Sequence, residues 1–335
     1  MSAARRAHAV RIHSYGDPEV MIHEAIEVAS PAAGQVQIRQ SAIGINYLDT
    51  YHRRGVFPLP TLPGVLGVEA AGTVVAVGEG VARLRIGDRV AYACPPIGSY
   101  TDLRNLGERY IVKVPDGVSD EQAAAVTLQG LTAHMLLHKV TRPASGQTLL
   151  VHAAAGGLGS LLTQWAKRFG VRVIGVIGSR AKVPLALTQG CDEVIVSESE
   201  AFTDGVRRLT GGEGVDVVFE GLGGRVFHES LTILKPFGQI VNLGQVAEGL
   251  PSVSLADLGP ARSLSVSVPG VFAYVRAQPD LQVAADELFG LIARGELRVR
   301  IGGRFALAEA AQAHRALQSR ATTGSLVLLA RKEIE

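Results

Sequence analysis

Cysteine is scarce in this chain of 335 residues, and other features that mark whole classes of protein are missing with it. The two cysteines, Cys94 and Cys191, lie far apart, which excludes a disulfide framework and a zinc site of four cysteines. No window approaches the roughly 20 consecutive apolar residues that a membrane-spanning helix needs. The early arginines are followed by no apolar segment of the kind found in signal peptides. We therefore expect a cytoplasmic protein without a membrane partner.

A large excess of one charge is also lacking. The formal net charge is +2, and the basic residues are scattered instead of forming a stripe with interleaved aromatics. Nucleic acid is therefore not an expected partner. Aromatic residues make up only 5% of the chain while glycine is abundant, a balance that is common among α/β enzymes.

The length exceeds what one hydrophobic core usually organises, so two domains are expected. Up to about residue 125, short segments such as 7–16 and 34–46 alternate apolar and polar residues, as half-buried strands do. A capping-box pattern, Ser119 with Gln122, then opens a long helix. Beyond it, apolar strands alternate with helices, which predicts a doubly wound parallel sheet.

The pattern therefore predicts the α/β class, with a Rossmann sheet and a mostly antiparallel β-domain. The expected domains are 1–126 for the β-domain, 127–268 for the Rossmann domain, and 269–335 for a C-terminal segment that returns to the β-domain. Helices are expected over 157–168, 180–189, 201–210 and 225–234.

A glycine-rich turn, Ala-Ala-Ala-Gly-Gly-Leu-Gly over 153–159, joins the first strand of this alternation to a helix. Glycines allow a sharp turn and the close approach of an anion, and the helix offers free N–H groups and the positive end of its dipole. The alternative is that the glycines only permit close packing of helix and strand. The βαβ context favours dinucleotide binding.

An acid is missing where the second strand of the alternation ends. Sites that prefer NAD usually carry Asp or Glu there to bind the ribose 2′-hydroxyl. This chain has Ser179, Arg180 and Lys182 instead, and a hydroxyl with two cations suits a 2′-phosphate. NADPH is therefore the expected cofactor, the alternative being that these cations are simply solvated.

The segments GINYLDTYHRRGVFP, LPGVLGVEAAGTVVAVGEGV, VHAAAGGLG and SRATTGS resemble the zinc-free, zeta-crystallin-like quinone oxidoreductases of the medium-chain dehydrogenase/reductase superfamily. The resemblance covers essentially the whole chain and implies a GroES-like fold for the β-domain. Zinc alcohol dehydrogenases of this superfamily use a Cys and a His as ligands where this chain has Asn46 and Val68. The resemblance therefore implies no metal, and Glu69 is expected to be buried beside an arginine or backbone donors.

The resemblance also implies the site residues. It places Asn46, Asp49 and Tyr51 near the nicotinamide and the acceptor, although Tyr51 can instead be a core aromatic and Asp49 can instead hold Arg53. The expected cofactor-binding residues are Gln129, Thr132, Ala155, Gly156, Gly157, Leu158, Gly159, Gly178, Ser179, Lys182, Ser197, Gly221, Leu243, Gly244 and Arg320.

The function that these residues and the resemblance imply is metal-independent hydride transfer from NADPH to a quinone. Reduction of α,β-unsaturated carbonyls is the alternative within enzymes, and a slowly reacting NADPH-binding sensor or structural protein is the alternative outside them. The segment Leu264–Val271 is rich in β-branched residues and is expected to be an edge strand through which a homodimer forms.

Overall fold

The computed structural model describes residues 4–246, 249–277 and 281–330, and it divides into two compact units. Unit 1 comprises residues 1–131 and 272–335, and unit 2 comprises residues 132–271. Functional domain bounds at 126 and 268 stay a prediction, and the expected C-terminal segment ends in residues 331–335, outside the described residues. None of the described helices combines the length and the apolar character that crossing a membrane requires.

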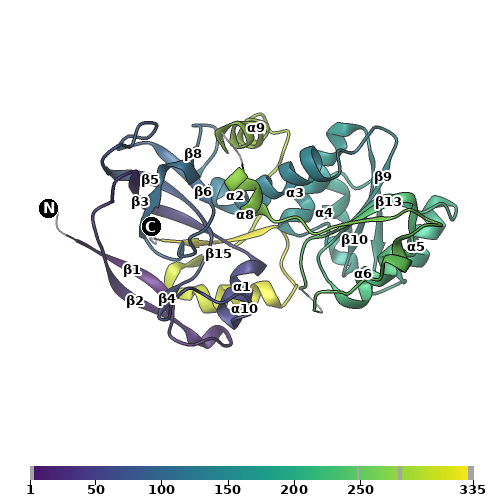
Figure 1. Ribbon diagram of the computed structural model, residues 1–335, viewed down its shortest axis with the longest axis horizontal. Helices are drawn as coiled ribbons and strands as arrows, with labels where there is room; N and C mark the ends of the chain where they lie inside the picture. Colours follow the sequence, from purple (N-terminus) through teal and green to yellow (C-terminus); the bar gives the residue numbers. More distant parts are fainter. Residues whose placement is uncertain (1–3, 247–248, 278–280, 331–335) are drawn as a thin grey trace. The chain divides into compact units, whose positions relative to one another are not determined.

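Unit 1 is built mainly from antiparallel strands, as the alternating patterns predict (Figure 1). Its strands are β1 (Arg5–Ile12), β2 (Met21–Val28), β3 (Gln35–Ile45), β4 (Gly64–Val65), β5 (Glu69–Val77), β6 (Arg89–Ala93), β7 (Leu103–Gly107), β8 (Ile111–Lys113), β15 (Ile301–Ala306) and β16 (Ser325–Leu329). One sheet has the order β2-β1-β4. The other has the order β15-β16-β3-β5-β6-β8, with β7 also paired to β3.

The C-terminal part of the chain completes this second sheet. β16 pairs antiparallel with β3, Leu326 lying opposite Ile45, and β15 pairs parallel with β16. The helices of unit 1 include α1 (Tyr47–Arg54), α9 (Leu281–Ala293) and α10 (Ala310–Gln318), while α2 (Asp120–Met135) begins in unit 1 and ends in unit 2. The predicted capping box is present, because Ser119 Oγ accepts from the Gln122 N–H (3.2 Å) and Gln122 Oε1 accepts from the Ser119 N–H (3.0 Å).

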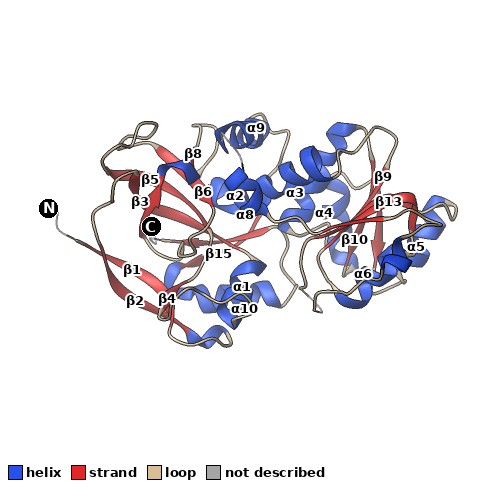
Figure 2. Cartoon of the chain, viewed as in Figure 1, coloured by secondary structure: helices blue, strands red, loops and turns tan. Residues whose placement is uncertain are grey.

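Unit 2 holds the predicted parallel sheet, in the order β11-β10-β9-β12-β13-β14. Its strands are β9 (Thr148–His152), β10 (Arg172–Ile177), β11 (Glu193–Val196), β12 (Val215–Glu220), β13 (Leu234–Asn242) and β14 (Ser265–Ser267). Its helices include α3 (Gly157–Ala166), α4 (Val183–Thr188), α5 (Phe202–Thr210), α6 (Gly224–Leu231) and α7 (Leu255–Leu258), and α8 (Val271–Ala277) begins at the boundary. Figure 2 shows α3 and α4 on one face of the sheet, with α5 and α6 on the other.

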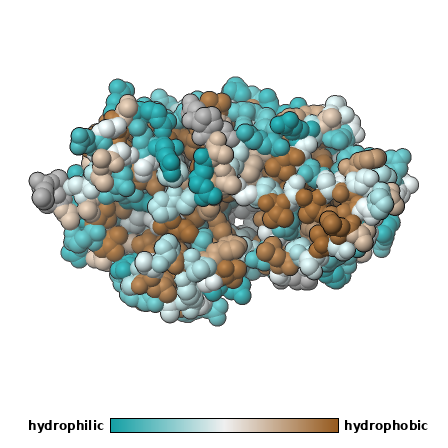
Figure 3. Space-filling model, in the orientation of Figure 1, coloured by the Kyte–Doolittle hydropathy of each residue, from teal (hydrophilic) through white to brown (hydrophobic). Residues whose placement is uncertain are grey.

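The core of unit 2 explains why this arrangement is stable. Leu150, Ile174, Ile195 and Val218 of the sheet pack against Phe202 and Val206 of α5 and Phe227 of α6. Burying each such side chain contributes about 1.5–3 kcal/mol. Apolar side chains also gather on the visible face of unit 2 (Figure 3).

Two predicted elements are shorter than expected. The strand expected over Leu264–Val271 covers only Ser265–Ser267, because Pro269 and Gly270 follow and Val271 already begins α8. The helix expected over 225–234 ends at Leu231, and β13 begins at Leu234. In both cases the apolar residues continue past a turn, so the sequence pattern extends the element beyond the point where the backbone ends it.

Candidate functional site

The glycine turn of unit 2 follows β9 and leads directly into α3, which begins at Gly157. The first N–H groups of a helix have no acceptor within it, so Gly157, Leu158 and Gly159 offer donors in a half-exposed first turn. A Cβ added to Gly159 would lie 2.4 Å from the Ala153 carbonyl oxygen, so this position needs glycine. The turn thus has the free donors and the bare backbone that a phosphate requires.

The loops after β10 and β11 lie at the same edge of the sheet as the glycine turn. Val176 of β10 pairs with His152 of β9, and Val196 of β11 pairs with Ile177 of β10. Gly178 and Ser179 follow β10, and Lys182 ends the short 3-10 helix Arg180–Lys182. Ser197 follows β11, and its Oγ donates to the Ile177 carbonyl (3.2 Å). The described residues of this segment, 178–182, include no carboxylate.

The loops after β12 and β13 are held together by a buried acid that sequence reasoning missed. Glu220 is fully buried, and its Oε2 accepts from Asn242 Nδ2 (3.0 Å) while Oε1 accepts from the Gly223 N–H (2.8 Å). Asn242 Nδ2 also donates to the Gly244 carbonyl (3.0 Å). Burial raises the pKa of Glu220. The available signal was an acid that ends an apolar strand immediately before a glycine-rich turn.

Glu220 and Asn242 therefore fix the backbone of the expected cofactor residues on this side. The Leu243 N–H donates to the Glu220 carbonyl (2.6 Å), and the Val246 N–H donates to that of Gly221 (3.0 Å). Together, the loops after β9, β10, β11, β12 and β13 form the carboxyl edge of the sheet, where dinucleotides bind in this class of fold. Gly156–Gly159, Gly178, Ser179, Lys182, Ser197, Gly221, Leu243 and Gly244 all lie on this edge.

In unit 1, the ends of two paired strands bring Asn46 beside Glu69. Asn46 follows β3, Glu69 begins β5, and Ile43 pairs with Ala70. Asn46 Nδ2 donates to Glu69 Oε1 (2.6 Å), and the Leu128 N–H donates to Glu69 Oε2 (2.7 Å). Glu69 is thus held by an amide and a backbone donor, and no arginine pairs with it among the described residues.

Asp49 lies one turn into α1 and is fully buried. Its Oδ2 accepts from the Asn46 N–H (2.8 Å) and from Tyr100 Oη (3.0 Å), while its Oδ1 has no hydrogen-bond partner. Burial raises the pKa of Asp49 to about 7, with these two hydrogen bonds opposing the shift. Asn46 and Asp49 are therefore hydrogen-bonded to each other, and their placement near the nicotinamide stays a prediction.

Asp49 does not hold Arg53 directly; two buried residues join them. Arg53 Nη1 donates to His314 Nδ1 (2.9 Å), and His314 Nε2 lies 2.9 Å from Tyr100 Oη. A guanidinium can only donate, so Nδ1 is an acceptor and the neutral ring donates from Nε2. Burial and the Arg53 charge lower the pKa of His314 to about 3, which keeps the ring neutral. Donation therefore runs in one direction, from Arg53 through His314 and Tyr100 to Asp49.

The remaining predicted site residues make separate contacts. Tyr51 is half-buried and packs edge-on against Phe57, with ring centroids 5.6 Å apart. Gln129 Oε1 accepts from Ser325 Oγ (3.0 Å). Arg320 follows α10 and lies close enough to Tyr47 to lower its pKa, although burial raises that pKa more strongly. Of the other two, Thr132 lies in the part of α2 that belongs to unit 2, and Ala155 in the glycine turn.

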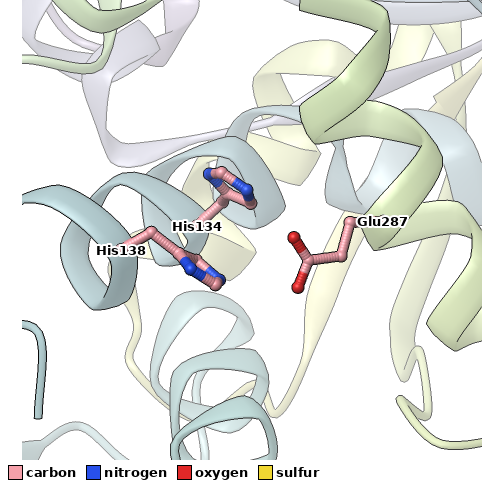
Figure 4. Close-up of side chains that lie close together, drawn as sticks. All are labelled: His134, His138 and Glu287. Atoms are coloured by element: carbon pink, nitrogen blue, oxygen red, sulfur yellow. The ribbon is translucent and has the colours of Figure 1, made fainter.

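The histidines spaced four residues apart on α2 and the π-helix after it are packed among aromatics. His134 and His138 stack with ring centroids 4.3 Å apart (Figure 4). Each of the two rings also meets Trp165 edge-on. Glu287, drawn with them, belongs to α9 of unit 1. The thiols are equally enclosed: burial raises the pKa of Cys94 to about 12 and that of Cys191 to about 11, so neither is a ready nucleophile.

Comparison with known proteins covers nearly the whole chain. Residues 32–125 match the alcohol dehydrogenase GroES-like domain and residues 189–328 the zinc-binding dehydrogenase family. A quinone oxidoreductase from Pseudomonas aeruginosa is 44% identical over 96% of this chain and 99% of its own length. A 2-haloacrylate reductase from a Burkholderia species is 37% identical, covering 95% and 97%. The crystal structure of Escherichia coli quinone oxidoreductase complexed with NADPH has a TM-score of 0.93 at 38% identity, covering 96% and 100%.

Proposed function

Since the chain belongs to the quinone oxidoreductases of the medium-chain dehydrogenase/reductase superfamily, we propose that it reduces quinones with NADPH and without a metal ion. The observation that carries this proposal is the carboxyl edge of unit 2. It combines a bare glycine turn, the free N–H groups of α3, and a β10 end that carries Ser179 and Lys182 where an NAD site carries an acid. Bound NADPH supplies the hydride.

The donor groups of unit 1 suit a reaction without a metal ion. At the two positions that hold zinc ligands in related alcohol dehydrogenases, Val68 offers no ligand atom and Asn46 gives its amide N–H to Glu69. A quinone is already a strong electrophile, and its reduced form takes protons from water. The protein therefore has to align the reactants and exclude solvent, which needs no Lewis acid.

In this mechanism the residues of the two units have separate tasks. In unit 2, the first turn of α3 holds the pyrophosphate, Ser179 and Lys182 bind the 2′-phosphate, and the clamp of Glu220 and Asn242 fixes the loops after β12 and β13. In unit 1, Asn46 and Tyr51 orient the reacting groups, and Asp49 holds the first turn of α1 through the Asn46 N–H.

The first experiment is steady-state oxidation of NADPH, and separately of NADH, after treatment with a chelator. The acceptors are 1,4-benzoquinone, 2-cyclohexenone and 2-chloroacrylate. We expect fastest turnover with the quinone, kcat/KM at least tenfold higher with NADPH than with NADH, and no loss on chelation. Faster turnover of the enone or the acrylate would contradict the quinone assignment, and tight NADPH binding without turnover would indicate a sensor or structural protein.

We also propose that the chain forms a homodimer through β14. This strand ends the order of the parallel sheet, so one of its sides has no strand partner among the described residues. Large apolar side chains are exposed beside it: Val268 directly follows it and is 71% exposed, and Leu255 of α7 is 86% exposed. The Leu258 carbonyl of α7 accepts from the Leu264 N–H (2.7 Å), which ties α7 to β14. A second copy of this edge would cover both.

The dimer is tested by replacing Leu255 and Val268 together with lysine. Buried lysines opposite each other destabilise a two-fold interface, so we expect the mass measured by light scattering to fall from dimer to monomer. The matched control is Val283→Lys, because Val283 is 66% exposed on α9 of unit 1. A wild-type monomer, or a double variant that stays dimeric, would contradict this interface.

A further inference from the structure

Glu69 is a buried acid that has no role in the proposed mechanism. It is fully buried at the start of β5, and both of its carboxyl oxygens accept from N–H groups. The donor to Oε2 is the backbone N–H of Leu128, which cannot rotate away. The donor to Oε1 is the side-chain amide of Asn46, which can turn end for end. Glu69 is therefore connected to one fixed group and one that can change orientation.

The backbone of β3 packs closely against Glu69. A Cβ added to Gly44 would lie 2.4 Å from Glu69 Oε1 and 2.3 Å from the Ala124 carbonyl oxygen. The bare backbone of β3 at Gly44 thus lets the acid approach both α2 and Asn46. Glu69 thus contacts β3, α2 and Asn46, while Asn46 keeps 8% of its surface exposed.

The Asn46 amide has a donor end and an acceptor end, and Glu69 occupies the donor end. Apart from the Asp49 N–H of the capping box at the start of α1, no described residue donates to Asn46 Oδ1, and a carbonyl oxygen can accept a second hydrogen bond. We propose that Glu69 is a positioning residue that turns the Asn46 amide so that Oδ1 accepts a hydrogen bond from a ligand hydroxyl group. The ribose of NADPH and the reduced quinone both carry such hydroxyls. This inference rests on the proposed function.

The protonation of Glu69 should make ligand binding depend on pH. Burial, with a smaller contribution from the nearby Asp49, raises the pKa of Glu69 to about 8, although the bonds from Asn46 and Leu128 lower it. Once protonated, Glu69 becomes a donor, and only Asn46 can turn to accept. The amide then presents Nδ2 instead of Oδ1. Binding that needs Oδ1 should therefore strengthen as the pH rises through the pKa of Glu69.

The other ionisable groups facing Glu69 are Asp49 of α1, Tyr92 of β6 and Tyr100 of the loop before β7. From α2, the group that meets it is the neutral N–H of Leu128. Burial raises the pKa of Tyr92 to about 12 and the pKa of Tyr100 well above its usual value, so both tyrosines stay neutral. Asp49 titrates near the same pH as Glu69 and must be separated from it by mutation.

The test compares Glu69→Gln with the double variant Glu69→Gln/Asn46→Asp. A glutamine at 69 keeps Oε1 for the Leu128 N–H and directs Nε2 at position 46, so Asn46 must present its donor end. In the double variant, an aspartate at 46 accepts from that Nε2 and again presents an acceptor oxygen. The matched control is Glu27→Gln on the exposed surface of β2.

The dissociation constant of NADPH is measured by fluorescence without a quinone between pH 6 and 9.5, followed by KM and kcat. At pH 9 we expect Glu69→Gln to bind NADPH about tenfold more weakly than the wild type. It should also lose the rise in affinity with pH, and the double variant should recover to within about threefold. An effect on KM or kcat with unchanged NADPH binding would assign the hydroxyl to the reduced quinone.

Three results would overturn the proposal. The first is a Glu69→Gln variant whose binding and kinetic constants equal those of the wild type at every pH, and the second is a variant that still binds NADPH more tightly as the pH rises. The third is a double variant that unfolds at the same urea concentration as the wild type but does not recover NADPH binding. If Glu69→Gln does not fold, the double variant decides alone, since it keeps both hydrogen bonds. A wild type that binds NADPH but does not reduce quinones would contradict the proposed function while leaving the binding comparison valid.

Discussion

Replacing Arg53 with methionine is expected to lower the free energy of unfolding by about 3 kcal/mol, because it removes several hydrogen bonds and leaves one buried acceptor without its donor. Arg53 is fully buried and donates to the Gly16 carbonyl (3.0 Å), to His314 Nδ1 (2.9 Å) and to Gln318 Oε1 (3.1 Å). Gln318 is exposed and Gly16 is half-buried, whereas His314 is fully buried and its Nδ1 would lose its donor. Methionine keeps much of the packing volume, so the decrease in the free energy of unfolding measures mainly the lost hydrogen bonds. Urea unfolding monitored by circular dichroism measures it.

The control is the neighbouring residue on the same helix. Arg54 is exposed, so Arg54→Met should change the free energy of unfolding by less than about 0.5 kcal/mol. Arg53→Lys keeps the charge but loses the planar fork of donors, and should fall between the two. If Arg53→Met were as stable as Arg54→Met, the chain from Arg53 to Asp49 would contribute nothing to the fold.

Introducing an acid at the end of β10 is expected to reverse the cofactor preference. In Ser179→Asp, a carboxylate replaces the hydroxyl proposed to meet the 2′-phosphate, and it stands where NAD sites carry their acid. Repulsion between the two anions should lower kcat/KM for NADPH about 100-fold, roughly 2.7 kcal/mol. The value for NADH should stay equal or rise several-fold, since the acid can accept from the 2′-hydroxyl. Steady-state kinetics with both cofactors and 1,4-benzoquinone measures the change.

A matched serine at the opposite edge of the sheet supplies the control. Ser145 precedes β9 and is exposed, so Ser145→Asp adds the same charge far from the carboxyl edge. We expect it to leave the NADPH to NADH ratio unchanged. An equal response of both variants would mean that net charge, and not a 2′-phosphate site at Ser179, sets the preference.

What the sequence predicted well is what neighbouring residues determine. The capping box at Ser119 and the start of α3 at Gly157 depend on a few consecutive residues, and the structure has both. The parallel sheet followed from repeated strand–helix alternation. The strand near β14 was read too long, because apolar residues continue beyond Pro269 although the backbone there no longer pairs.

What the sequence could not predict depends on residues brought together by the fold. His314 meets Arg53 across 261 positions and Tyr100 across 214, and no local pattern marks either contact. The sequence left two possible partners for Glu69, an arginine or backbone donors. The structure has a backbone donor, the Leu128 N–H, together with the Asn46 amide. Electrostatics favours an arginine, but only the strand register of β3 and β5 decides which side chain is near.

The discontinuity of unit 1 has a consequence for protein synthesis. The edge of β3 that pairs with β16 is made at Ala42–Ile45, but its partner, Leu326–Leu329, is translated about 280 residues later. Unit 2 lies between them as one continuous segment, 132–271. Domains fold as they leave the ribosome, so unit 2 has its full set of strands while unit 1 still lacks β15 and β16. Unit 2, whose synthesis begins after that of unit 1, is therefore the first unit that can fold completely.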